Sequence, residues 1–302
     1  MLLYNIRFGW WNVALSPSAP QAKTKASTET YPIILNHIRT LMLDDSCDFL
    51  ALCEVSAQDV QYISDNLDLG DGVTLLDLTH TVGRTRFDIA VIYKNTKLKV
   101  RHKATLSKPF TGNTVKAAQM VEVENIDDSK QIYLYLCHWA SRLNGDGHDK
   151  RVAAASMVYD SAIEYMEAGK DVIVMGDFND NPYDESLYRC LRANRCHDAV
   201  KKYPNEFFYN PFWRSVVSEY KYSHAGTQNT YRSGSHKFKQ FLGTIWHTYD
   251  QIVVSGSFLN NGYWHLNEFR TQILTPASLL ADFEDSKHFI DHLPIVCEVT
   301  RV

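Results

Sequence analysis

The residues with the clearest capacity for chemistry lie in the stretch DVIVMGDFNDNP, Asp171–Pro182. Its apolar part, Val172 to Met175, is short, rich in β-branched residues and bounded by glycines, which predicts a buried strand. Asp177, Asn179 and Asp180 follow directly, and the proline prevents regular structure from resuming. Oxygen ligands on a loop at the end of a rigid element suit a hard cation. The alternative is an Asx-rich turn that satisfies its own backbone, and this stretch alone does not decide between the two.

Polar residues stand at the ends of other apolar runs as well. Glu54 ends DFLALCEV, and His138 lies near the end of QIYLYLCHW. Taken singly, such a residue is usually a turn former or a hydrogen-bonded, half-buried group. The complete set of polar strand ends is Asn5, Glu54, Asp88, His138, Asp177, Asn179, Asp250, Asp291 and His292. Nine such groups together favour a shared site.

Helical periodicity in three segments indicates what positions these strand ends. Apolar residues at helical spacing begin near Tyr31, recur in the segment Val60–Leu67, and form one stripe along Val152–Met166. Strand-like runs separate the three segments. This alternation predicts an α+β architecture in which two sheets pack face to face, with helices outside. Strand ends that share an edge of such a sandwich form one rim.

Two segments do not follow the strand and helix patterns. Residues 10–30 begin with two tryptophans and continue with Ser, Pro, Ala, Lys and Thr, which predicts a long surface loop. Residues 203–248 interleave aromatic and basic side chains. Aromatic faces beside cations can stack bases and neutralise phosphates, although we expect most of these rings to belong to the core.

The composition limits the class of protein. The 302 residues are 45% hydrophobic, enough for a sizeable core, and we expect a single domain over residues 1–302. A formal net charge of -4 argues against coating nucleic acid by bulk charge, so a polyanion needs a local basic groove. The six cysteines contain no CxxC pair, which favours a reducing compartment. No apolar run approaches the roughly 18 residues of a membrane span, so we expect a cytoplasmic protein; oligomeric state is not predicted.

The order of the motifs resembles one known family. Asn5 in YNIRF, Glu54 in LCEV, His138 in CHWASR, the GDFN motif, Asp250 in YDQIVVS and Asp291-His292 in DHLP are similar to the endonuclease/exonuclease/phosphatase superfamily, with a deoxyribonuclease I-like set of histidines. The motifs span nearly the whole chain. The resemblance implies a four-layer α/β/β/α sandwich and Mg²⁺-dependent hydrolysis of a phosphoester, with Mn²⁺ as a possible substitute.

The resemblance also implies roles for single residues. The metal ligands would be Glu54, with Asn5 and Asp291 near the same cation. Asp177 would orient or deprotonate the attacking water, and Asn179 would help to hold it. The contacts to the phosphate and the groups that orient them would be His292 with Asp250, and His138 with Asp88. Arg142 and Arg232 are the candidates for contact with substrate.

Two positions depart from the family pattern. Ile290 precedes Asp291 where the family often has serine, and Arg7 stands where some abasic-site enzymes have an acidic residue that serves as a second metal ligand. We expect a nuclease that acts on DNA or RNA. One alternative is a phosphatase or phosphodiesterase on an inositol phosphate or sphingomyelin-type lipid; Trp10-Trp11 and Phe207-Phe208 are candidates to face a membrane in that case, although we expect a core role for them. The other is a binding module that has lost catalysis.

Overall fold

The computed structural model describes residues 4–18, 23–83, 85–110, 112–142, 147–218, 221, 223–225, 232–239, 243–260 and 262–301. Within them, one six-stranded sheet has the order β16 (His265–Ile273), β17 (Ile295–Arg301), β1 (Tyr4–Asn12), β2 (Phe49–Cys53), β6 (Ile89–Lys94) and β3 (Val73–Asp77). A seven-stranded sheet has the order β11 (Ala193–Asn194), β12 (Phe208–Tyr209), β15 (Asp250–Ser255), β10 (Asp171–Asp177), β9 (Gln131–His138), β8 (Asn113–Asn125) and β7 (Leu98–Phe110). The short pairs are β4 (His80–Val82) with β5 (Thr85–Phe87), and β13 (His236–Lys237) with β14 (Trp246–His247).

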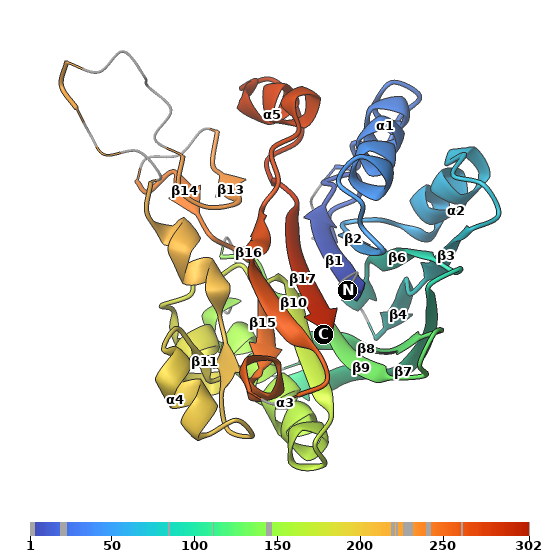
Figure 1. The fold of residues 1–302 in the computed structure, drawn as a ribbon. Helices are drawn as coiled ribbons and strands as arrows, with labels where there is room; N and C mark the ends of the chain where they lie inside the picture. Colours follow the sequence, from blue (N-terminus) through green and yellow to red (C-terminus); the bar gives the residue numbers. More distant parts are fainter. Residues whose placement is uncertain are drawn as a thin grey trace.

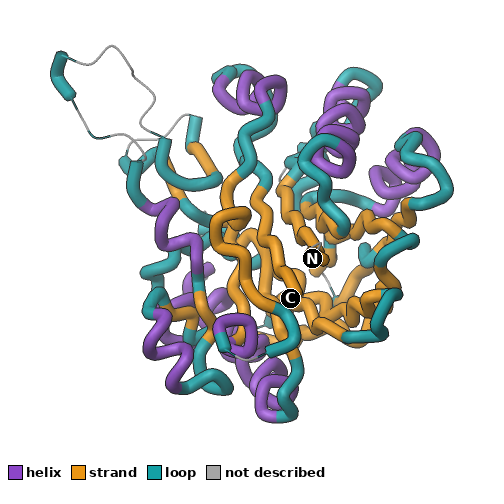
Figure 2. The backbone as a smooth tube through the Cα atoms, in the orientation of Figure 1, coloured by secondary structure: helices purple, strands orange, loops and turns teal. Residues whose placement is uncertain are grey.

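Helices cover the outer faces of both sheets (Figures 1 and 2). On the six-stranded sheet these are α1 (Thr30–Leu43), α2 (Ala57–Asn66) and α5 (Ala277–Glu284). On the seven-stranded sheet they are α3 (Gly147–Glu167) and the π-helical turn η1 (Ser186–Cys190). The helix α4 (His197–Lys202) and the 3₁₀ turns η2 (Pro211–Val216) and η3 (Gly256–Leu259) lie in the connections. None of the described helices is both long and apolar enough to cross a membrane.

Three apolar clusters hold the layers together. The central cluster joins the inner faces of the two sheets and includes Phe8, Trp10, Phe49, Leu134 and Ile252. A second cluster joins the six-stranded sheet to its helices, and a third joins the seven-stranded sheet to α3. The predicted four-layer α/β/β/α sandwich is therefore confirmed.

The strand β1 is longer than the sequence pattern predicts. Trp10 and Trp11 belong to this strand rather than to a surface loop, and both are fully buried. Because neighbouring residues of a strand point to opposite faces, Trp10 packs in the inter-sheet core and Trp11 packs toward the helices. The expected core role of this pair is confirmed, and neither ring can face a membrane.

Three of the described aromatic residues of the 203–248 segment are buried, while others are half-buried and Tyr203 is exposed. Phe208, Tyr209 and Phe212 belong to the core, and Arg214 pairs with Glu268 rather than remaining free. Residues 219–220, 222, 226–231 and 240–242 of this segment lie outside the described part of the chain. The core interpretation is confirmed for the rings that are described and buried.

Strand direction brings the polar ends to one rim. β1 and β2 run parallel, with Asn12 opposite Cys53, the residue before Glu54. β9 and β10 run parallel, with His138 opposite Asp177, and β15 runs antiparallel with Asp250 opposite the same aspartate. Asp88 precedes the strand β6, which is antiparallel to β2. The rim therefore combines the carboxyl ends of β1, β2, β9 and β10 with the beginnings of β6 and β15, which run antiparallel to β2 and β10.

The glycine of the GDFN motif is required by close packing within the sheet. A Cβ atom at Gly176 would overlap the backbone carbonyl of Cys137 on β9. We expect Gly176→Ala to destabilise the protein by about 1–3 kcal/mol or more, because the clash is with backbone that cannot move aside. Gly72→Ala is the control, since its Cβ would meet only Thr96 Cγ2 at 3.5 Å. Urea unfolding of both variants measures the difference, and equal stabilities would contradict this explanation.

Candidate active site

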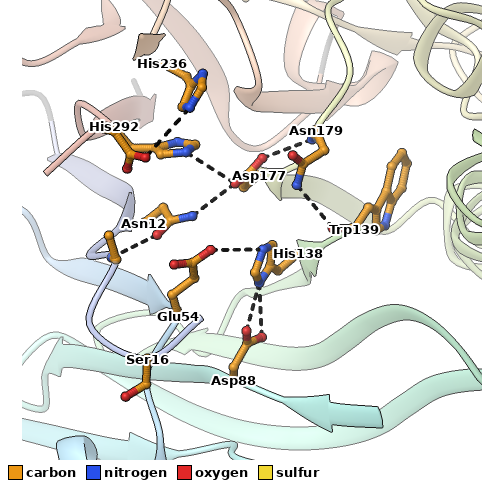
Figure 3. Close-up of polar contacts among 12 residues, drawn as sticks. Asn12, Ser16, Glu54, Asp88, His138, Trp139, Asp177, Asn179, His236 and His292 are labelled. Carbon is orange, nitrogen blue, oxygen red and sulfur yellow. Dashed lines mark hydrogen bonds and ion pairs between the residues drawn. The ribbon is translucent and has the colours of Figure 1, made fainter. Parts of the chain in front are cut away.

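Asp177 lies at the centre of the rim, at the end of β10 (Figure 3). Its carboxylate is almost fully buried and accepts hydrogen bonds from Asn12 Nδ2 at 3.1 Å and from the backbone N–H of Asn179 at 2.9 Å. Asn179 has a φ of 51°, which asparagine tolerates better than most residues, and its Nδ2 donates to the Trp139 carbonyl at 3.2 Å. These contacts fix the turn after β10, so the sequence-predicted pair Asp177 and Asn179 is brought together.

His292 is held by a buried carboxylate. Its Nδ1 lies 2.7 Å from Asp250 Oδ2, and its Nε2 lies 3.8 Å from Asp177 Oδ2. Asp250 also accepts hydrogen bonds from Ser235 Oγ at 2.7 Å and from Trp10 Nε1 at 3.2 Å. Burial opposes the charged form of His292, but Asp250 and Asp177 outweigh it and hold the pKa of His292 well above its usual value. The imidazolium thus formed is suited to contact an anionic phosphate.

His138 is held in the same manner on the other side. Its Nδ1 lies 2.9 Å from Asp88 Oδ2, while its Nε2 faces Glu54 Oε1 at 3.8 Å. Lys116 Nζ lies 2.6 Å from Asp88 Oδ1. Although burial works against the charged Asp88 carboxylate, His138 and Lys116 outweigh it and lower its pKa below the usual range. The predicted pair His138 and Asp88 therefore exists, with a lysine added.

Glu54 follows directly after β2, and its backbone has a φ of 59°. A left-handed glutamate is a strained conformation that its surroundings must hold. The hydrogen bonds from Ser16 N to Glu54 O at 2.6 Å and from Val55 N to Asp88 O supply that constraint. Burial is the largest effect on the pKa of Glu54 and raises it. The negative charges of Asp291 and Asp88 raise it further, whereas His138 lowers it, and the resulting pKa is about 7.

These carboxylates fit a divalent cation. Glu54 and Asp291 provide two carboxylates, and Asp177 adds a third negative charge to the rim. Such a set repels itself unless a cation is present, and one or two carboxylates with waters and substrate phosphate form the usual environment of Mg²⁺. Glu54 and Asp291 are therefore the residues that would hold it.

Mg²⁺ binding should depend on pH through Glu54. Folding raises the pKa of the Glu54 carboxyl from 4.5 to about 7. The protonated carboxyl therefore favours the folded state, and its full contribution to the free energy of unfolding is present below about pH 4.5. That stability is lost as the pH rises through the higher value. We therefore expect Mg²⁺ to raise the Tm more at about pH 8 than at about pH 6, because it offsets an ionised carboxylate only at the higher pH. Thermal unfolding with Mg²⁺ or EDTA at both pH values measures this, and an equal increment would contradict it.

The structure corrects the expectation for Asn5. Asn5 lies near the start of β1, paired with Thr300, whereas the site lies at the other end of the strand. Asn12 is the asparagine of the rim; its Oδ1 accepts from Ala14 N at 3.0 Å and its Nδ2 donates to Asp177. The motif YNIRF led to the wrong asparagine because the strand continues through the tryptophans.

The two arginines expected to contact substrate differ in position. Arg142 lies beside the site, where Nε donates to the Asn179 carbonyl at 2.8 Å and the guanidinium pairs with Asp180 and Asp184. It therefore holds the loop after β10. Arg232 lines a separate cavity of about 390 Å³ beside η2 and β16, together with Phe212.

Sequence reasoning did not identify three residues of this rim. Lys116 on β8, Ser235 before β13 and His236 on β13 reach the site through long-range pairing. His236 pairs with His292 as a β-bridge, and burial, with His292 and His247 nearby, holds its pKa well below its usual value. No local pattern marks these residues, because their roles depend on strands far apart in the sequence.

Comparison with known proteins identifies the family of the chain. Residues 16–280 match the model of the Endonuclease/Exonuclease/phosphatase family. The chain belongs to this family, so the sequence-based resemblance is confirmed. A search of curated proteins found no match.

Solved structures of similar fold cover nearly the whole chain. The catalytic domain of human Nocturnin with bound sulfate is 16% identical with a TM-score of 0.60, covering 99% of this chain and 95% of that chain. Truncated TDP2 from Caenorhabditis elegans is 15% identical with a TM-score of 0.57, covering 99% and 98%. The mannosyl-6-phosphatase Bt3783 of Bacteroides thetaiotaomicron is 16% identical with a TM-score of 0.56, covering 97% and 99%. At these identities the similarity shows the fold.

The family and the site together define a class of enzyme. The chain is a phosphoester hydrolase of the Endonuclease/Exonuclease/phosphatase family, and its buried histidine and aspartate cluster is consistent with a divalent-metal site. The solved structures of the same fold are of different proteins, including Nocturnin, TDP2 and a mannosyl-6-phosphatase. Fold alone therefore leaves the substrate open.

Proposed function

We propose that this chain is a Mg²⁺-dependent phosphodiesterase that cleaves DNA or RNA. The observation that carries the proposal is the pair of carboxylate-held histidines, His292 with Asp250 and His138 with Asp88, facing one rim that also holds Glu54. A bound Mg²⁺ would polarise a non-bridging phosphate oxygen and neutralise its charge. Hydrolysis also needs a cationic contact to the phosphate and a proton donor near the leaving oxygen, and the two histidines supply these.

The charges near the rim favour a diester over a terminal phosphate. A phosphomonoester carries up to two negative charges, and its recognition calls for a compact set of free cations. Lys116 and Arg142 contact residues of the rim, but Lys116 is paired with Asp88, and Arg142 with Asp180 and Asp184. The singly charged diester requires less positive charge, which His292 and a metal ion can provide.

A recess beside the rim suits a nucleobase. It has a volume of about 350 Å³ and is lined by Tyr183, Ile245 and Trp246, with polar groups from Asn181 and Thr248. Its position follows from the chain, since Asn181 lies two residues after Asn179 and Thr248 two residues before Asp250. The exposed ring of Tyr183 provides a face on which a base can stack.

A substrate panel tests the proposal. Purified protein is incubated with Mg²⁺ or Mn²⁺, and with EDTA as control, on plasmid, linear duplex, single-stranded DNA and RNA. Inositol phosphates, sugar phosphates and sphingomyelin form the second set. We expect metal-dependent cleavage of at least one nucleic acid. Release of phosphate or phosphocholine from the second set, with every nucleic acid intact, would overturn the proposal in favour of a small-molecule or lipid phosphoesterase.

A further inference from the structure

We propose that His236, Asp291 and His292 form a second cation site, one with two nitrogen donors, that takes Zn²⁺. These residues present ligand atoms that all lie within 4.8 Å of one another. His236 Nε2 lies 3.9 Å from Asp291 Oδ2. The rings of His236 and His292 lie close together (Figure 3), with centroids 4.4 Å apart. Two imidazoles and one carboxylate, with a water as fourth ligand, form a common arrangement around zinc.

The surrounding structure holds the two histidines in place for this role. His292 and His236 are joined by a β-bridge between their backbones. His292 Nδ1 is held by Asp250 at 2.7 Å, which leaves Nε2 free to bind a metal; a carboxylate behind a ligating histidine is a usual feature of zinc sites. The ring of His236 stacks on Tyr249 with centroids 5.1 Å apart. Little movement is therefore needed to bring the donor atoms around one ion.

The donor types separate this site from the Mg²⁺ site. Glu54 offers oxygen, which Mg²⁺ prefers, whereas His236 and His292 offer nitrogen, which Zn²⁺ accepts readily and Mg²⁺ does not. Both His236 and His292 are buried, while the Asp291 side chain is 41% exposed, so an ion can enter from solvent through the aspartate. Asp291 is shared between the two sites, so occupation of one affects the other.

Zinc at this position would inhibit hydrolysis. Binding displaces the proton from His292 Nε2 and occupies the atom that would contact phosphate. This consequence rests on the proposed function, whereas the binding of zinc does not. We therefore expect Zn²⁺ to inhibit the Mg²⁺-activated enzyme, and EDTA followed by fresh Mg²⁺ to restore it.

The test measures binding directly, without an activity assay. Zn²⁺ is titrated into the protein with excess Mg²⁺ present, in competition with a chromophoric chelator, for the wild type, His236→Gln and the control His148→Gln. His148 is exposed at the start of α3, where its Nε2 lies 3.4 Å from Glu185 Oε2, and it belongs to neither proposed cation site. We expect one zinc ion per wild-type and control chain, and affinity reduced by more than about 100-fold in His236→Gln, because a direct ligand is lost. Substitution of Co²⁺ should give visible absorption from nitrogen coordination in the wild type.

The outcomes separate the inference from the proposed function. Zinc affinity unchanged in His236→Gln, with a Tm like that of the wild type, would overturn the site. Failure of the wild type to bind zinc both with and without Mg²⁺ would also overturn it. Should His236→Gln fold poorly, an oxygen-type Co²⁺ spectrum in the wild type overturns the site. Zinc binding that depends on His236 in a protein that cleaves no nucleic acid would support the site while contradicting the proposed substrate.

Discussion

His292→Ala is expected to reduce kcat by about 10²–10⁴-fold, with little effect on the fold. The Nδ1 of this imidazole is held by Asp250 at 2.7 Å, and its Nε2 faces the rim. Removal of the ring would therefore take away the proposed contact to the negative charge that develops on the phosphate. The measurement is steady-state hydrolysis of the substrate that the panel identifies, with Tm as a check on folding.

The matched control for this prediction is His148→Ala. His148 carries the same type of side chain but lies exposed on α3, so its kcat should equal that of the wild type. Asp250→Asn should have an intermediate effect, because the amide still contacts His292 but no longer favours the imidazolium. Retention of wild-type kcat by His292→Ala would exclude this histidine from the chemistry.

Glu54→Gln is expected to weaken Mg²⁺ binding by more than about 100-fold, since the substitution removes the charge of the proposed ligand at constant shape. Activity at a fixed Mg²⁺ concentration should fall accordingly. The same variant should be more stable than the wild type in EDTA at about pH 8, because the wild-type carboxyl, whose pKa is about 7, must then ionise in a buried and acidic environment. Loss of function with gain of stability is the expected signature of a residue kept for binding.

Isothermal titration with Mg²⁺ and thermal unfolding with EDTA together measure both effects. Glu185→Gln, an exposed glutamate on the surface, serves as the control and should change neither quantity. If Glu54→Gln bound Mg²⁺ as tightly as the wild type, the cation would have to lie elsewhere on the rim.

The sequence allowed the layers and most of the rim to be predicted because strand ends are local features. A carboxylate follows the runs VIVM and LALC within two residues, and the alternation of strands with helices limits how those ends can meet. In the structure Asp177 lies opposite His138 and Asp250, as that argument requires. Placement of these residues together was therefore accessible from the sequence and the family resemblance.

The error at Asn5 has a local cause. The pair Trp10-Trp11 followed by small and polar residues looks like the start of a loop, yet both rings are buried on opposite faces of a continuing strand. The end of a strand depends on what covers it, which the sequence of that strand does not contain. Asn12 could have been found from FGWWN if the tryptophans had been assigned to the core.

Other residues were inaccessible for a different reason. Lys116 reaches Asp88 across a pairing of distant segments, and His236 reaches His292 through an isolated bridge. Neither has a motif or a periodic neighbour that marks it. Contacts of this type require the three-dimensional arrangement, because the residues involved share no local pattern.

The most direct test of the central claim, that this rim is one metal-dependent centre for phosphodiester hydrolysis, uses bis(p-nitrophenyl) phosphate and p-nitrophenyl phosphate. EDTA-treated protein is assayed for nitrophenolate release before and after addition of Mg²⁺, beside Asp177→Asn. We predict that Mg²⁺ restores cleavage of the diester in preference to the monoester, and that Asp177→Asn lacks this activity. Hydrolysis that persists in EDTA, or that Asp177→Asn retains, would contradict the claim.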